Sequence, residues 1–187
     1  IVTIVAARPG MGKSSLMMVG ADAASAAGAG VHVFAFEDSD ESLADRAMSG
    51  LSGVAAESIR NFSLNRGELG QIGNAMNRLT ARKNWRVERR PSPYVDDIVR
   101  AVRRDVAELK TALVFIDYVQ LLRGPRARKY RTGDREQELS DIATELMQAA
   151  REDSIAYVLG SQPNRGCEQR DNKRPQLKLV VIGEART

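Results

Sequence analysis

Cysteine and histidine are scarce in this chain of 187 residues. Its single cysteine, Cys167, excludes an internal disulfide and a zinc site built from several cysteines, and it suits a reducing compartment such as the cytoplasm. The single histidine, His32, stands within an apolar, strand-like stretch. We therefore expect His32 to pack in the interior and not to bind a metal.

Long hydrophobic runs are also missing. No stretch of about eighteen apolar residues occurs, so we expect no membrane-spanning helix. The chain begins inside an apolar run with no charged segment ahead of it, which argues against a signal peptide and leads us to expect a fragment of a longer protein. With 43% hydrophobic residues and no internal repeat, residues 1–187 have enough apolar mass for a single domain with one core.

Apolar runs and amphipathic helical patterns alternate along the chain. This order predicts an α/β fold with a mostly parallel, twisted sheet and helices on both faces. The predicted strands cover residues 1–6, 31–37, 85–89, 112–118, 155–161 and 178–184. The predicted helices lie near residues 13–26, 43–48, 95–109 and 139–150, where apolar residues recur on one helical face.

A phosphate-binding loop follows the first predicted strand. Residues 7–14 read Ala-Arg-Pro-Gly-Met-Gly-Lys-Ser, although the strict pattern has glycine at the first position. Glycine lets the chain curl so that backbone N–H groups surround a phosphate, and the next helix directs its N-terminus at the anion. A chance glycine-rich turn is the alternative. We predict that nucleotide is bound by Ala7, Arg8, Pro9, Gly10, Met11, Gly12, Lys13, Ser14 and Ser15.

Acidic residues close two predicted strands at the edge where open α/β sheets bind ligands. Asp117 follows an apolar run in the Walker B pattern and is expected to hold Mg²⁺ together with Ser14. The next residue is Tyr118, whereas many P-loop ATPases have a glutamate there. Glu37 closes strand 31–37 and is our candidate for the base that activates water. The alternative for Glu37 is to favour the start of the next helix.

A neutral amide, Gln162, follows the predicted strand 155–161. An amide beside a γ-phosphate can sense whether that phosphate is present and pass the difference to the loop that it begins. The alternative is an ordinary polar residue at a strand end.

Positive charge gathers in two loop-like stretches, residues 123–135 and 165–174, although the net charge is only +4. We predict that they contact a nucleic acid backbone through Arg126, Arg128, Lys129, Arg131, Arg165 and Arg170. The alternative is ordinary solvated surface. Aromatic residues make up 5% of the chain, so tracking of the backbone is favoured over extensive base stacking.

Together these segments resemble the C-terminal RecA-like ATPase domain of DnaB-type replicative DNA helicases. The most specific similarity is carried by Phe-Ile-Asp-Tyr-Val-Gln-Leu-Leu at 115–122, Arg-Glu-Gln-Glu-Leu-Ser at 135–140 and Gly-Ser-Gln-Pro-Asn-Arg at 160–165. The resemblance implies a homohexameric ring that moves on single-stranded DNA, with ATP and Mg²⁺ bound between subunits. It also implies a bacterial or phage protein that meets a primase and a helicase loader.

The resemblance implies roles for individual residues too. Lys13, Ser14 and Asp117 match residues that bind ATP and magnesium, Glu37 matches the catalytic glutamate, and Gln162 matches the residue that couples nucleotide state to DNA-contacting loops. Arg186 matches an arginine that reaches the γ-phosphate of the neighbouring subunit.

The chain departs from the family pattern in three respects. The N-terminal domain and the linker helix of the family are absent. A DNA-binding loop that usually follows Pro175 is replaced by a direct run into residues 178–186, so we expect a missing segment near 177–178. Glu184 stands where the family usually has lysine.

Two other functions are compatible with the residues. One is a RecA-like ATPase of recombination or clock type, which would exchange strands without unwinding duplex; the Asp-Tyr-x-Gln-Leu and Ser-Gln-x-Asn-Arg strings argue against it. The other is an assembly module that binds ATP to hold a ring without productive hydrolysis. That module would form nucleotide-dependent oligomers and would tolerate Glu37→Gln.

Overall fold

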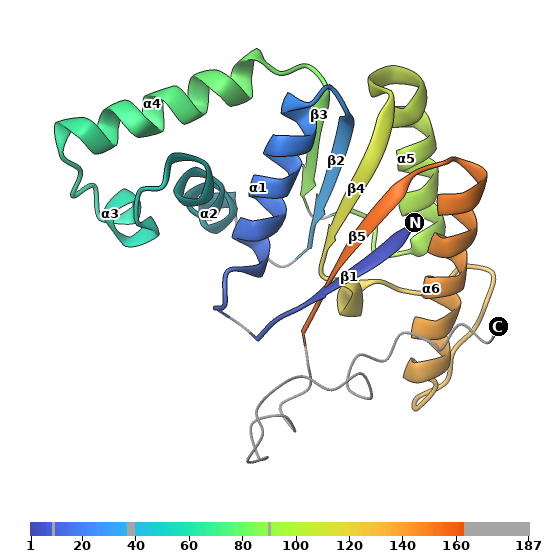
Figure 1. Cartoon of the computed structure of the whole chain (residues 1–187). Coiled ribbons are helices and arrows are strands. Elements are labelled where there is room, and N and C mark those ends of the chain that lie inside the picture. Colours follow the sequence, from blue (N-terminus) through green and yellow to red (C-terminus); the bar gives the residue numbers. More distant parts are fainter. Residues whose placement is uncertain (9, 37–39, 90, 163–187) are drawn as a thin grey trace.

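The computed structural model of the chain describes residues 1–8, 10–36, 40–89 and 91–162 (Figure 1). Five parallel strands form one sheet in the order β1-β5-β4-β2-β3. The strands are β1 (Val2–Ala6), β2 (Gly30–Ala35), β3 (Trp85–Arg89), β4 (Thr111–Asp117) and β5 (Ala156–Ser161). Five of the six predicted strands, and the parallel α/β class, are therefore confirmed; the predicted strand 178–184 lies outside the described residues.

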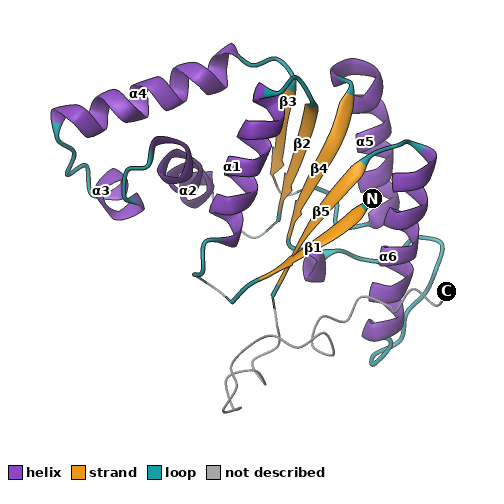
Figure 2. Cartoon of the chain, viewed as in Figure 1, coloured by secondary structure: helices purple, strands orange, loops and turns teal. Residues whose placement is uncertain are grey.

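Helices cover both faces of this sheet (Figure 2). The bounds are α1 (Lys13–Ala26), α2 (Asp40–Ser52), α3 (Ala56–Arg60), α4 (Arg66–Ala81), α5 (Val95–Leu109), the 3-10 helix η1 (Val119–Leu121) and α6 (Arg135–Glu152). Helix α1 lies on one face, with α2, α3 and α4 beyond it, and α5 and α6 lie on the other. In the described part of the chain, no helix combines the length and apolar character needed to cross a membrane.

The predicted helices correspond to α1, α2, α5 and α6, whereas α3 and α4 were not predicted. Helix α4 carries a start signal in the sequence. The side chain of Asn65 accepts a hydrogen bond from the N–H of Glu68 at 2.9 Å, and the Glu68 carboxylate accepts one from the N–H of Asn65 at 2.8 Å. This capping box satisfies two amides that the helix would otherwise leave without partners.

Each face of the sheet has its own hydrophobic core, because successive side chains of a strand point to opposite faces. Phe34, Ile116 and Leu159 pack with α5 and α6. Val33 and Phe115 pack with α1 and α2 on the opposite face. The inner strands β2, β4 and β5 are consequently buried on both faces over most of their length, whereas the outer strands β1 and β3 are partly exposed.

The strand ends are level at the edge that carries the site. Ala6 of β1 pairs with Ser161 of β5, and Ala35 of β2 pairs with Asp117 of β4. The ends of these strands thus lie at the same edge of the sheet, toward the bottom of Figure 1.

His32 is buried in β2, as expected. Its ring stacks on Phe34 with the ring centroids 3.9 Å apart, and its Nδ1 lies 2.6 Å from Oδ2 of Asp105. Burial, followed by the positive charges of Arg86 and Arg104, lowers the pKa of His32 to about 4. We conclude that the imidazole is neutral at pH 7 and belongs to the interior of the fold.

Candidate nucleotide-binding site

The loop between β1 and α1 curls around the N-terminus of α1. Gly10 and Gly12 have φ angles of 78° and 82°, a left-handed conformation that glycine adopts without strain. A Cβ at either position would meet no described atom within 4 Å, so the space beside the loop is open. The first turn of α1 has no acidic residue, and the N-cap residue Gly12 has no side chain that could cap the helix. Within the described chain, this helix start is therefore open to an anion.

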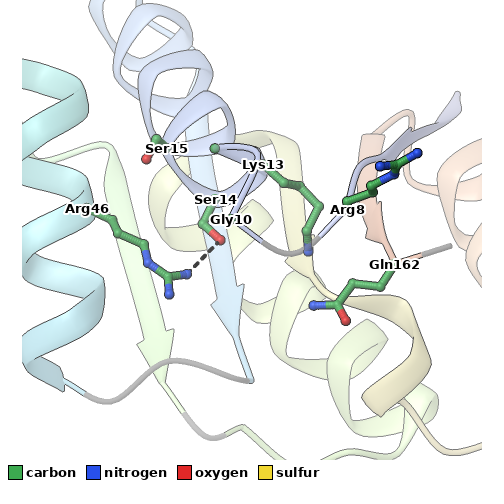
Figure 3. A pocket seen from close by; sticks show the side chains of 8 residues that line it. Arg8, Gly10, Lys13, Ser14, Ser15, Arg46 and Gln162 are labelled. Atoms are coloured by element: carbon green, nitrogen blue, oxygen red, sulfur yellow. Dashed lines mark hydrogen bonds between the residues drawn. The ribbon is translucent and has the colours of Figure 1, made fainter. Parts of the chain in front are cut away.

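A cavity of about 240 Å³ lies beside this loop (Figure 3). Residues of the predicted loop line it together with the predicted Gln162 and with one residue of α2; the lining is Arg8, Gly10, Gly12, Lys13, Ser14, Ser15, Arg46 and Gln162. The predicted Ala7 and Met11 do not line the cavity. The lining contains three cationic side chains and no carboxylate, which suits a polyanion.

Lys13, which lines the cavity, forms a buried pair with Asp117 at the end of β4. The Nζ of Lys13 donates a hydrogen bond to Oδ1 of Asp117, and both residues are buried, with 7% and 6% exposed. The same Nζ lies 4.8 Å from the ring centroid of Tyr118. A Cβ on Gly160 of β5 would come within 2.9 Å of this Nζ, so glycine leaves the room that the pair occupies.

Ser14 has a partner that the sequence analysis did not predict. Nη1 of Arg46, on α2, donates to the Oγ of Ser14 at 3.5 Å (Figure 3). Helix α2 packs closely on α1, since a Cβ at Gly50 would come within 3.2 Å of Val19. No local pattern in the sequence distinguishes Arg46 from surface arginines, because its position depends on how α2 packs.

Gln120 in η1 is a second residue that the sequence analysis did not single out. Its Nε2 donates to the Oγ of Ser161 at 2.7 Å and to the carbonyl oxygen of Gln162 at 3.1 Å. The N–H of Gln162 donates to Oε1 of Gln120 at 3.3 Å. The amide of Gln120 thereby joins the segment after β4 to the residue that lines the cavity.

The predicted DNA-contacting residues of the first basic stretch are exposed in the loop between η1 and α6. Nη2 of Arg126 lies 2.6 Å from Oδ2 of Asp97, and Nη1 of Arg128 lies 2.6 Å from Oδ2 of Asp141. These ion pairs attach the loop to α5 and α6. Lys129 and Arg131 are also exposed.

Several predicted site residues lie outside the described residues. They are Pro9, Glu37, Arg165, Arg170 and Arg186, and Glu184, which departs from the family pattern, also lies there.

A glycine-rich loop at a strand–helix turn, with a buried lysine on an aspartate at the end of a parallel strand, defines a P-loop NTPase. Residues 2–179 match the family model described as DnaB-like helicase C terminal domain. The chain belongs to this family, which confirms the resemblance seen in its motifs.

Curated relatives agree with this family. The chain is 33% identical over 182 residues to the replicative DNA helicase DnaB of Helicobacter pylori, covering 95% of this chain and 36% of the relative. It is 31% identical over 178 residues to the replicative DNA helicase DnaC of Bacillus subtilis, covering 95% of this chain and 38% of the relative. The chain thus spans little more than a third of the length of these relatives.

Solved structures show the same RecA-like fold. One is a chain from the structure of a DnaB-like replicative helicase and its interactions with primase, with a TM-score of 0.84 and 26% identity over 98% of this chain and 43% of that chain. Another is the structure of an ATPase domain, with a TM-score of 0.82 and 24% identity over 96% of this chain and 63% of that chain.

Proposed function

We propose that this chain is the ATP-hydrolysing motor domain of a replicative DNA helicase. It would couple ATP turnover to movement along single-stranded DNA and to unwinding of duplex. One observation carries the proposal: in a chain of this helicase family, Lys13, Asp117 and Gln162 come together beside the phosphate-binding loop. Membership of the family favours this function over a recombination or clock ATPase.

The residues of the site fit a nucleoside triphosphate and Mg²⁺. The open space beside Gly10 and Gly12 fits a phosphate, which the loop amides would bind. Lys13 donates a hydrogen bond to Asp117 in this structure. When a nucleotide binds, the ammonium group would exchange this carboxylate for phosphate oxygens. Ser14 and Asp117 would then hold Mg²⁺, which, when bound, supplies positive charge to the phosphate oxygens. Arg46, which lines the same cavity, adds positive charge on the side of α2.

The remaining catalytic roles follow from the sequence and the family. Glu37 would orient the attacking water, and Arg186 of a neighbouring subunit would stabilise the transition state, an effect of roughly 10³–10⁵ in rate. Gln162 would sense the γ-phosphate. The position of Gln162 in the cavity wall supports that role.

The same proposal extends to the assembly. We propose that residues 1–187 act as one ATPase domain in a hexameric ring of identical subunits, in a bacterium or a phage-infected cell. Single-stranded DNA would contact the basic loop between η1 and α6, and the predicted Arg165 and Arg170 would add to this surface. A primase and a helicase loader are the expected protein partners. The DnaB-like replicative helicase whose structure resembles this chain interacts with primase.

Steady-state ATP hydrolysis by the full-length protein, with and without single-stranded DNA, tests the function. We expect clear stimulation by DNA, because a translocating motor turns over ATP as it moves. Hydrolysis that is indifferent to DNA, or nucleotide-dependent oligomers without hydrolysis, would favour the assembly module instead.

A further inference from the structure

The loop that carries the basic residues is connected to the nucleotide cavity by a continuous series of hydrogen bonds. The series starts at Gln162, which lines the cavity and shares two backbone hydrogen bonds with the side-chain amide of Gln120. A third hydrogen bond, to the Oγ of Ser161 at 2.7 Å, fixes the same amide on the end of β5. Any displacement of Gln162 therefore acts on Gln120.

Arg135 continues the series from the backbone of Gln120. Its Nη2 donates to the carbonyl oxygen of Gln120 at 2.7 Å and to that of Leu122 at 3.0 Å. Its Nη1 donates to the Glu138 carboxylate. The planar guanidinium thus holds η1 and the first turn of α6 together, and a lysine has no comparable fork of donors.

Glu138 completes the connection to the loop. Its Oε1 accepts a hydrogen bond from the N–H of Gly124 at 3.0 Å, and the residue is only 5% exposed. Burial raises the pKa of Glu138, but the Gly124 N–H and the Arg135 guanidinium outweigh burial and hold this pKa below its ordinary value. Glu138 is therefore ionised at neutral pH and bonds strongly to both groups.

Gly124 is the first residue of the basic loop, residues 124–134. A Cβ at this position would come within 2.5 Å of the Tyr130 side chain, so glycine permits Tyr130 to close over the loop start. The hydroxyl of Tyr130 in turn donates to Oδ2 of Asp141 at 2.8 Å. Tyr130 thus joins the start of the loop to α6, and a movement of Gly124 would displace the Tyr130 side chain.

We propose that Gln120, Arg135 and Glu138 are positioning residues that transmit a displacement of Gln162 to the basic loop. This coupling relay rests on the proposed function, in which Gln162 senses the nucleotide and the loop contacts DNA. Two of the three residues, Arg135 and Glu138, lie within the Arg-Glu-Gln-Glu sequence at the start of α6. Connectivity alone does not establish energetic coupling, so the test has to measure a difference between nucleotide states.

The test compares two dissociation constants of the full-length protein for a fluorescent oligo-dT. One is measured with a non-hydrolysable ATP analogue and one with ADP, and their ratio reports the coupling. For the wild type we expect a ratio of about 5-fold or more, the usual range for coupled sites. In Glu138→Gln and in Arg135→Lys we expect the ratio to fall to within about 2-fold of unity.

Two further variants make the result specific. Gln148→Ala is the matched control, because Gln148 is exposed near the far end of the same helix and its side-chain amide donates to Glu152, at 2.7 Å, away from the relay and the basic loop. It should keep the wild-type ratio. Gln120→Ala removes the connection at the opposite end of the relay. In this variant too, the ratio of the two dissociation constants should fall to within about 2-fold of unity.

A merely structural role has a different signature. If the three residues only hold the loop in shape, the variants will bind DNA more weakly in both nucleotide states and the ratio will persist, which overturns the relay. Thermal melting identifies a variant that fails to fold, and the remaining variants then decide. A wild-type ratio of unity would instead contradict the proposed function, and the relay with it.

Discussion

At the scale of the residue, the site depends on one buried charge pair. Lys13 and Asp117 are almost fully enclosed, and each compensates the charge of the other. Removing one partner of such a pair leaves a buried charge without compensation, which costs about 3–5 kcal/mol. In the proposed function, a bound nucleotide would take the place of Asp117, because its phosphates would offer Lys13 the same negative charge.

Lys13→Ala should abolish ATP turnover, because the ammonium group that would bind the phosphate oxygens is lost. The variant should also melt at a lower temperature, because Asp117 loses the buried partner that compensates its charge. Hydrolysis and thermal melting of the same preparation measure both effects. Lys83→Ala, at an exposed lysine for which no role is proposed, is the control and should leave turnover unchanged. Turnover retained by Lys13→Ala would remove the phosphate-binding loop from the mechanism.

Glu37→Gln should separate binding from chemistry. The amide keeps the size of the side chain but cannot accept the proton of the attacking water. We expect ATP to bind with little change and hydrolysis to stop, measured by equilibrium binding of a fluorescent ATP and by turnover. Near-normal hydrolysis would assign the base to another residue.

His32 should make the stability of the fold depend on pH. Its pKa is about 4 in the folded protein and 6.5 as the unperturbed value. Between these values the unfolded chain binds more protons, so the contribution of His32 is present above pH 6.5 and is lost as the pH falls towards 4. Relative to His32→Asn, the wild type should lose about 2 kcal/mol of unfolding free energy between about pH 7 and pH 5.

Urea denaturation at the two pH values measures this loss. Comparison with the variant isolates His32 from its titratable and charged neighbours, which are Glu88, Asp105, Arg86 and Arg104. A gain of stability on acidification would mean that the two carboxylates, and not burial, control the imidazole.

At the scale of the element, α4 shows how a helix starts where the hydrophobic pattern alone does not predict one. Its capping box is entirely local, since both hydrogen bonds join Asn65 and Glu68. The helix packs on α2, which carries Arg46 to the nucleotide cavity. The stability of α4 therefore supports the element that completes the site.

Asn65→Ala should lower the unfolding free energy by about 1 kcal/mol, the usual cost of losing an N-cap side chain. Urea denaturation measures this change. Asn74→Ala is the matched control, because Asn74 is exposed in the middle of the same helix, where alanine is the better helix former. An equal loss in both variants would mean that the capping box contributes nothing particular.

At the scale of the whole molecule, the parallel sheet brings the nucleotide cavity and the basic loop to the same edge. The cavity lies after β1 and β5, and the loop lies after β4, the neighbour of β5 in the sheet. The relay is short for this reason. In the proposed ring, the basic loop and the nucleotide site of every subunit would therefore lie at the same edge of its sheet.

Charge reversal at Arg126, Arg128 and Lys129 should weaken binding of single-stranded DNA. If the three residues each neutralise one phosphate, the slope of log affinity against log salt should also fall by about 2, or roughly 0.7 per contact. A salt titration of oligo-dT binding measures it. Lys83→Glu is the control, because Lys83 is exposed just before β3, at the opposite edge of the sheet. An unchanged slope would mean that the basic loop is ordinary solvated surface and does not contact DNA.

Arg126 and Arg128 require one refinement of this test. Their ion pairs with Asp97 and Asp141 were not predicted, and a reversed charge would face a carboxylate at each. Lys129→Glu alone avoids this effect, so it should reduce the slope without disturbing the loop.

The sequence by itself determined the features whose causes are local. The period of apolar residues predicted the five described strands and the helices α1, α2, α5 and α6, and the glycines of residues 7–14 predicted the phosphate-binding loop. Family motifs singled out Lys13, Asp117 and Gln162, because their neighbours along the chain form a specific string.

Only the tertiary structure decided which distant side chains meet. Arg46 reaches Ser14 because α2 packs on α1, and Gln120 joins Gln162 because β4 and β5 are neighbours in the sheet. The tertiary structure also shows that Arg126 pairs with Asp97 and that Arg128 pairs with Asp141, which the sequence did not predict. The physical reason is that side-chain contacts depend on the packing of whole elements, which spacing along the chain does not encode.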